Sequence, residues 1–181
     1  MLGSKTCVHR PRALRAVLTT LVVITLQVVG QRPAAAGPLT AVRTPSGPSL
    51  DGKLDDACWS EAPIATDFRV MNTERLAKAQ TAVQFAFDDN ALYIGVRCSE
   101  AEVDSIVTRP LPRDDADVFR TDCVEIMLDP TASQNDYVHL AVNASGSLAD
   151  RACTQGGFVG DMSWDSTARA ASFIGPDFWS C

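Results

Sequence analysis

Glu125, His139 and Asn143 lie in two short alternating stretches of this sequence, with Phe119 and Tyr137 close to them. A carboxylate or an amide can hydrogen-bond neighbouring hydroxyl groups, and an aromatic ring can cover the apolar face of a ligand. These residue types together indicate a binding site for a neutral, hydroxyl-rich ligand. The alternative is that Phe119 is a core residue and Glu125 a solvated strand residue.

A second candidate site is acidic and contains Asp114, Asp115, Asp117 and Asp122. Calcium binds several carboxylate and carbonyl oxygens, so this segment predicts Ca²⁺ as the candidate cofactor. The alternative is a solvated acidic loop. No other cofactor is expected, and the sequence contains neither a P-loop nor a GxGxxG or HExxH pattern.

Two adjacent strands are expected to position the first site. Residues 123–129 and 136–143 each alternate between apolar and polar side chains, and residues 130–135 are rich in turn-forming types. This pattern predicts an antiparallel hairpin. If both apolar rows face one core, paired residue numbers must sum to an even value, such as 125 with 139 or 141. Glu125, His139 and Asn143 are then expected on one outer face, exposed to solvent.

The rest of the chain is expected to be built from short strands. Further strands are predicted at residues 39–42 (an edge strand), 64–71, 81–87, 91–98, 146–152 and 164–173. Because no long helical period appears after the N-terminal segment, the sequence predicts an all-β fold, an antiparallel β-sandwich of immunoglobulin-like type.

The first 36 residues have the three parts of a secretory signal peptide: a basic front, an apolar run at 16–29 and small residues at 34–36. The apolar run is short for a membrane span, which needs about 20 residues. We therefore expect cleavage near Ala36, no transmembrane span in the mature chain, and a secreted, periplasmic or cell-surface location. Retention as a membrane anchor is the alternative.

Removal of residues 1–36 would leave an acidic chain. That segment holds five of the 16 Lys and Arg residues and none of the 22 Asp and Glu residues, so the remainder carries 11 basic against 22 acidic residues, a formal charge of −11. An acidic surface disfavours nucleic acid and anionic membranes as partners. Five cysteines remain without CxxC spacing, which disfavours a metal–thiolate site and leaves disulfide pairing open.

The order of these signals resembles carbohydrate-binding module family 9. The resemblance rests on LDGKLDDACW at 50–59, FDDNALYIGVRC at 87–98, RDDADVFRTDCVEIMLD at 113–129, YVHLAVNASGSLAD at 137–150, WD at 164–165 and DFW at 177–179. It implies a DOMON-like β-sandwich over residues 50–181, preceded by a linker or edge strand at 37–49. It also implies polysaccharide or oligosaccharide ligands and a role beside glycan-degrading enzymes.

The resemblance also implies roles for individual residues. Phe119 takes the position of an aromatic that stacks on sugar, Glu125 that of an acid that accepts sugar hydroxyls, and Asn143 that of a polar residue on the next strand. The stacking aromatic in the family is usually Trp. Ala141 stands where a basic residue is expected, and His139 is the candidate substitute.

The family usually continues past the DFW segment with more strands and a second aromatic, whereas this chain ends at Cys181. We therefore expect an incomplete domain, followed in the full protein by a catalytic or β-barrel domain. One alternative is the N-terminal part of a glycoside hydrolase. Another is a cell-surface structural or interaction domain without sugar binding. A haem site that uses Met127 and His139, as in some DOMON-like domains, is a third.

The chain itself is expected to be non-catalytic, with no catalytic residue assigned. A glycosidase needs two carboxylates about 5–10 Å apart across a cleft. Glu125 and Asp129 lie four residues apart on one strand face, roughly 13 Å at 3.3 Å per residue, and no nucleophile elbow is present.

Overall fold

The computed structural model describes residues 39–181, so the predicted signal peptide at 1–36 lies outside the described residues. The elements are β1 (Val42–Arg43), α1 (Ala57–Glu61), β2 (Thr81–Phe87), β3 (Leu92–Ser99), η1 (Val103–Ser105), η2 (Ala116–Arg120), β4 (Cys123–Leu128), β5 (Tyr137–Asn143), β6 (Leu148–Thr154), η3 (Gln155–Gly157), β7 (Val159–Asp161), β8 (Phe173–Ile174) and β9 (Phe178–Ser180). Within this part of the chain, every helix is too short or too polar to span a membrane.

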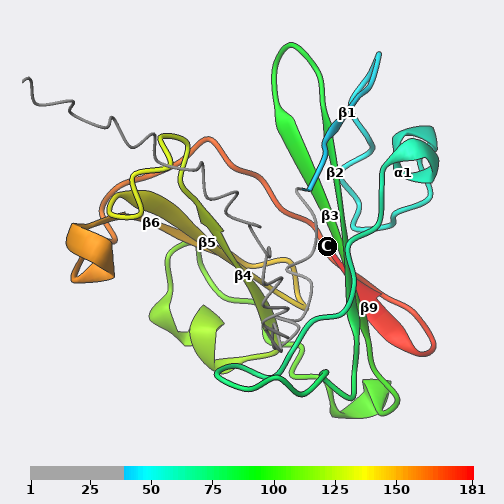
Figure 1. Ribbon diagram of the computed structural model, residues 1–181. Coiled ribbons are helices and arrows are strands. Elements are labelled where there is room, and N and C mark those ends of the chain that lie inside the picture. The colour runs from blue at the N-terminus through cyan, green and yellow to red at the C-terminus, as the bar shows by residue number, and fades with distance from the viewer. Residues whose placement is uncertain (1–38) are drawn as a thin grey trace, which may run out of the picture. The chain divides into compact units, whose positions relative to one another are not determined.

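The strands form two sheets, which Figure 1 shows as two layers with α1 outside the larger one. The larger sheet has the order β1-β2-β3-β9-β8, and the smaller has the order β4-β5-β6-β7. All neighbouring strands are antiparallel except β1, which runs parallel to β2. The prediction of an all-β antiparallel sandwich is therefore confirmed.

The central hairpin obeys the predicted even-sum rule. Strands β4 and β5 are antiparallel, and Glu125 lies opposite Ala141, one of the partners that the rule allowed. The hairpin of β2 and β3 is also confirmed, with Phe87 opposite Leu92 across the turn. In both hairpins, alternation and turn chemistry were sufficient because every contact is local.

Two predicted strands are wrong. Residues 64–71 make only isolated bridges, and Asp67 has a φ of 66°, in the left-handed region that interrupts an extended strand. Residues 164–173 are irregular, and β8 begins only at Phe173. In the latter segment, side chains take the backbone groups that a neighbouring strand would pair: Asp150 accepts from the Ser166 amide, and Arg113 donates to the Ala168 carbonyl.

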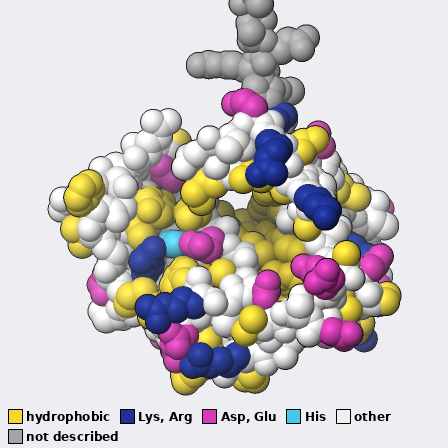
Figure 2. All heavy atoms as spheres, turned by 90° about the horizontal axis from the view of Figure 1, so that it is seen from below, with side chains coloured by type: hydrophobic (Ala, Val, Ile, Leu, Met, Phe, Trp, Pro, Cys, Tyr) yellow, Lys and Arg dark blue, Asp and Glu magenta, His cyan; other side chains and the backbone are white. Residues whose placement is uncertain are grey.

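The apolar interior is closed at one end of the sandwich. Buried Trp179, Ile106 and Ala144 form a cluster there, with Cys98 and Val124 packed against it. Away from this cluster, the side chains of β4 and β5 that face the interior are only half-buried. They are Ile126, Leu128, Val138 and Leu140. Figure 2 shows a hollow lined by hydrophobic side chains in this face of the molecule. The two sheets are thus held together mainly through the Trp179 cluster.

The cysteines in the described part are all free thiols: Cys58, Cys98, Cys123, Cys153 and Cys181. Burial raises the pKa of Cys98 to about 11 and that of Cys181 to about 12. Both side chains are therefore neutral thiols at physiological pH and pack as small apolar groups.

Gly52 joins the N-terminal turn to the last strands. Its φ is 79°, and its carbonyl accepts a hydrogen bond from the Ser180 hydroxyl at 2.7 Å. A Cβ at this position would lie 2.6 Å from the Phe173 amide nitrogen and still closer to the Ser172 backbone. Gly52 is therefore required both by its conformation and by the space around it.

Replacing Gly52 with Ala is expected to lower the free energy of unfolding by about 2–4 kcal/mol, measured by urea denaturation. About 1 kcal/mol comes from the left-handed conformation, and the rest comes from the backbone clash. Gly156→Ala is the matched control, since Gly156 has a φ of 67° but nothing within 4 Å of a built Cβ. Equal losses in the two variants would show that the clash contributes nothing.

Candidate functional site

Glu125, His139 and Arg151 lie side by side on the outer face of the smaller sheet, one from each of β4, β5 and β6. His139 is directly opposite Arg151 on β6 and Met127 on β4, and Glu125 lies two residues before Met127 on the same face of β4. The His139 Nε2 atom lies 2.7 Å from Glu125 Oε2. Arg151 donates from Nε at 3.0 Å and from a terminal nitrogen at 2.8 Å to His139 Nδ1. The three side chains form one hydrogen-bonded chain across three strands.

The two bonds determine the protonation of His139. Nδ1 accepts from Arg151, which carries only donors, so the proton resides on Nε2 and is donated to Glu125. Burial and the Arg151 charge lower the pKa of His139, while Glu125 opposes them. His139 is therefore neutral at pH 7, and the chain of Glu125, His139 and Arg151 carries no net charge.

The turn η2 covers one side of this chain of residues. Asp115 caps η2 by accepting the Asp117 amide at 2.9 Å. The Phe119 ring then lies over His139, with a centroid separation of 5.4 Å and a tilt of 59°, and the Arg151 guanidinium carbon is 5.3 Å from the centre of the same ring. Phe119 is half-buried, so part of the residue remains accessible to solvent.

Part of the predicted solvent-exposed face is covered, and that prediction is wrong for His139 and Asn143. His139 is 2 % exposed and Asn143 is fully buried. The reason is that Val118, together with half-buried Leu111 and Phe119, packs against Ala141 and Ala149. The segment before β4 thus folds back over the outer face of β5 and β6.

Asn143 is engaged in holding a turn. Its Oδ1 accepts the backbone amides of Ser145 and Ser147 at 3.0 and 2.8 Å, and its Nδ2 donates to the Arg109 carbonyl at 3.1 Å. Gly146, with a φ of 78°, completes this turn between β5 and β6. The VN-x-x-G segment therefore encodes a turn and an anchor for the covering segment. A sugar contact by Asn143 stays a prediction, and it would require this turn to open.

Glu125 and Tyr137 occupy the accessible part of the face. The Glu125 side chain is 44 % exposed, and Met127, on the same strand face, is 56 % exposed. Tyr137 lies two residues before His139 on the same face of β5 and is half-buried. Figure 2 shows acidic, basic and histidine side chains together with exposed hydrophobic ones. Glu125 thus remains accessible next to the buried His139, and Tyr137 lies further along β5 on the same face.

Arg151 is the member of this group that the sequence prediction missed. It comes from a strand that was predicted at 146–152, and alternation places it on the outer face once β6 is paired with β5. Its stem passes Gly160 of β7, where a built Cβ would be 3.3 Å from Arg151 Cδ. The absence of a side chain at Gly160 leaves room for Arg151 to reach His139.

The arrangement bears on the haem alternative. Met127 is directly opposite His139, as that alternative requires. Both ring nitrogens of His139 are already bonded, one to Glu125 and one to Arg151. Iron ligation by His139 would first have to break one of these bonds.

The four aspartates of the predicted calcium site are not brought together. Asp115 caps η2, Asp117 pairs with Arg109 at 3.1 Å, and Asp122 accepts the Val107 amide at 2.8 Å. Only Asp114 belongs to a cluster of three carboxylates in residues 39–181, and the other two members are Asp150 and Asp165. Calcium binding by this chain stays a prediction.

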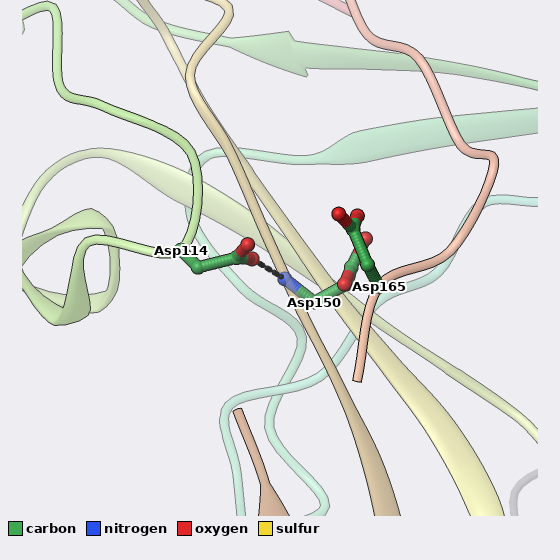
Figure 3. Close-up of side chains that lie close together, drawn as sticks. All are labelled: Asp114, Asp150 and Asp165. Carbon is green, nitrogen blue, oxygen red and sulfur yellow. Dashed lines mark hydrogen bonds between the residues drawn. The ribbon is translucent and has the colours of Figure 1, made fainter. Parts of the chain in front are cut away.

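Figure 3 shows this cluster, with Asp114 from the segment before η2, Asp150 from β6 and Asp165 from the loop after β7. Asp114 accepts the Asp150 backbone amide at 2.9 Å. The Arg113 guanidinium pairs with all three carboxylates: with Asp165 at 2.8 Å, with Asp114 at 3.6 Å, and most closely with Asp150. A protein cation thus already occupies the position between these acids.

A shallow cavity of about 340 Å³ lies elsewhere, between the segment 42–48 and α1. Its lining contains none of the predicted site residues. The face around Glu125 is therefore not part of this cavity.

Comparisons with known proteins agree with the fold and with the early resemblance. The model of the family described as carbohydrate family 9 binding domain-like matches residues 50–152, more than half of the chain. No functionally curated protein matches. Among solved structures, the chain resembles a carbohydrate binding module family 9 from Caldicellulosiruptor kristjanssonii in complex with glucose, with a TM-score of 0.52 and 18 % identity.

That match covers 78 % of this chain and 64 % of the other one, and at this identity it shows the fold alone. Family membership rests on the sequence match, which includes Phe119, Glu125, His139 and Arg151. This chain belongs to the carbohydrate family 9 binding domain-like family.

Proposed function

We propose that this chain is an exported, non-catalytic module that binds neutral oligosaccharides or polysaccharides through the outer face around Glu125. The observation that carries the proposal is the accessible Glu125 carboxylate, held by His139 at 2.7 Å, with the half-buried Phe119 ring over the same histidine. A pyranose offers an apolar face to a ring and equatorial hydroxyls to a carboxylate. The related family 9 module, whose structure contains glucose, supports the choice of ligand class.

The pairing of Glu125 supports a binding role. Glycoside hydrolysis uses two carboxylates that flank the scissile bond. Here the group that holds Glu125 is a neutral histidine, which in turn is held by Arg151. Such an arrangement fixes an acceptor for sugar hydroxyls and does not provide the second carboxylate of that mechanism.

Affinity electrophoresis of the purified chain on gels that contain xylan, soluble cellulose or other glycans tests the proposal. Titration calorimetry with oligosaccharides then gives the affinity. We expect retardation on at least one neutral glycan. A chain that is folded by circular dichroism but is retarded by no glycan would instead favour a structural or interaction domain.

Replacing Phe119 with Leu is expected to weaken binding about 3- to 10-fold, because Leu retains apolar packing over His139 but lacks the ring that covers a sugar face. Calorimetry with the selected oligosaccharide measures the change. Phe68→Leu is the control, since Phe68 is 42 % exposed on the loop before β2. An unchanged affinity in Phe119→Leu would remove Phe119 from the site.

A further inference from the structure

The contact between Arg151 and His139 has a property that the proposed site does not require. A guanidinium has only donors, so this contact exists only while His139 Nδ1 carries no proton. The other ring nitrogen faces Glu125 at 2.7 Å and donates to it in either protonation state. A single proton on Nδ1 therefore breaks the Arg151–His139 contact and leaves the His139–Glu125 hydrogen bond intact.

Arg151 also supports the aromatic ring. Its guanidinium carbon lies 5.3 Å from the centre of Phe119, and the same ring lies 5.4 Å from His139. Loss of the Arg151–His139 contact would therefore free a cation beneath Phe119 and place two positive charges next to each other. The surroundings of both Phe119 and Glu125 would change together.

We infer that Arg151 is a positioning residue that orients Glu125 through His139, and that protonation of His139 releases Arg151 and weakens glycan binding in mildly acidic solution. The inference rests on the proposed function. It adds Arg151 to the residues of the site, and it adds the requirement that His139 be neutral for strong binding.

Among residues 39–181, two charged groups act on His139. Glu125 faces it from β4 and Arg151 from β6. From η2, the contact is the uncharged Phe119 ring.

The charged side chains of η2 are engaged with each other and with the preceding segment. Arg120 pairs with Asp117 at 3.2 Å, and Asp117 pairs with Arg109 at 3.1 Å. On β5, the neighbouring group on the same face is Tyr137, whose pKa is raised chiefly by its hydrogen bond with Cys153, so that it stays neutral. Glu125 and Arg151 are thus the charges that act on His139.

The sign of the pH effect follows from these contacts. Burial and the Arg151 charge lower the pKa of His139, and Glu125 opposes them. The ordinary pKa of histidine is about 6.5. Because the pKa of His139 is lower, His139 stays mainly neutral at pH 6.5 and gains its proton below that pH. Glycan affinity should be flat above pH 6.5 and should fall below it by up to tenfold per pH unit.

Nitrogen-15 NMR of the imidazole tests the positioning step without any ligand. The chain has two histidines, His9 and His139, so a His9→Gln background leaves one signal. We expect the Nε2–H tautomer and a pKa below 6.5. Arg151→Met should mix the tautomers and raise the pKa of His139, because the neighbouring positive charge is removed. Arg75→Met, at an exposed loop position, is the charge-matched control and should change neither.

Calorimetry between pH 7.5 and 5 tests the binding step. Arg151→Met should weaken binding about 3- to 10-fold at pH 7.5. His139→Gln cannot titrate, so its affinity, relative to its own value at pH 7.5, should stay level to pH 5. Parallel pH profiles for His139→Gln and the unaltered chain, or mixed tautomers in the unaltered chain, would overturn the inference. Absence of glycan binding at every pH would overturn the proposed function and the binding step, whereas the NMR result decides the Arg151–His139 contact separately.

Discussion

Replacing Arg113 with Met is expected to lower the free energy of unfolding by about 3 kcal/mol, measured by guanidinium chloride denaturation. The Asp150 side chain has no exposed surface, and Arg113 is its ion-pair partner. Removing one partner of a buried pair leaves an uncompensated charge and typically costs 3–5 kcal/mol. We expect the lower end of this range because the Arg113 side chain is 35 % exposed and Ser166 continues to donate to Asp150.

The same substitution should loosen a long irregular segment. Arg113 donates to the Ser166 and Ala168 carbonyls at 3.1 and 3.2 Å and pairs with Asp165 at 2.8 Å. These contacts attach residues 165–168 to β6. Limited proteolysis should therefore cut this segment faster in Arg113→Met than in the unaltered chain, under conditions where both are folded.

Two further variants isolate the buried charge. Arg113→Met combined with Asp150→Asn should recover part of the loss, since the buried group is then neutral. Arg169→Met, at an exposed position next to the same segment, should change stability by no more than about 0.5 kcal/mol. A loss below 1 kcal/mol in the single Arg113 variant would mean that Asp150 finds another partner or reaches water.

The parts of the fold that sequence predicted correctly depend on neighbours in the chain. The hairpin of β4 and β5 follows from two alternating rows and a turn, and these predict its existence and leave residues such as 139 or 141 as partners of Glu125. The structure selects Ala141. The hairpin of β2 and β3 follows in the same way. Alternation states which residues share a face, but it does not state what lies on that face.

The burial of the outer face could not be predicted for this reason. Residues 109–120 have no strand or helix period, yet they supply Val118 and Leu111 to a cluster with Ala141 and Ala149. The small residues Ala141 and Ala149, which pair on this outer face, were the available signal. They leave room for a covering segment, and Asn143 then had to become a buried anchor instead of an exposed donor.

The remaining errors concern charges whose partners are distant in sequence. Asp150 lies on the same face of the smaller sheet as Leu140, where alternation predicts an apolar residue, and its partner Arg113 is 37 residues away. Arg151 was recognisable only after β6 had been paired with β5, since the pairing puts it opposite His139. Arg113 pairs with the buried carboxylate of Asp150, and Arg151 donates to the buried ring of His139. The alternation within one strand predicts neither contact.

Replacing Glu125 with Gln is expected to weaken glycan binding about 10- to 100-fold at pH 7.5, measured by calorimetry with the oligosaccharide that affinity electrophoresis selects. Hydrogen bonds to a charged acceptor contribute about 1.5–3 kcal/mol, more than those to a neutral amide. Gln keeps the shape of the side chain and can still accept the proton of His139 Nε2. The loss therefore reports the carboxylate charge at the sugar hydroxyls and not a collapse of the face.

Two controls distinguish this interpretation from a general change in charge or fold. Glu102→Gln removes one carboxylate at an exposed position before η1 and should bind as the unaltered chain does. In Glu125→Gln, the pKa of His139 should fall further, because Glu125 is the group that raises it. A lowered His139 pKa together with unchanged affinity would show that the carboxylate is in place but does not contact the glycan, and the binding face would then have to lie elsewhere. If affinity and pKa both fall, the Glu125 carboxylate both accepts the proton of His139 and contacts the sugar hydroxyls.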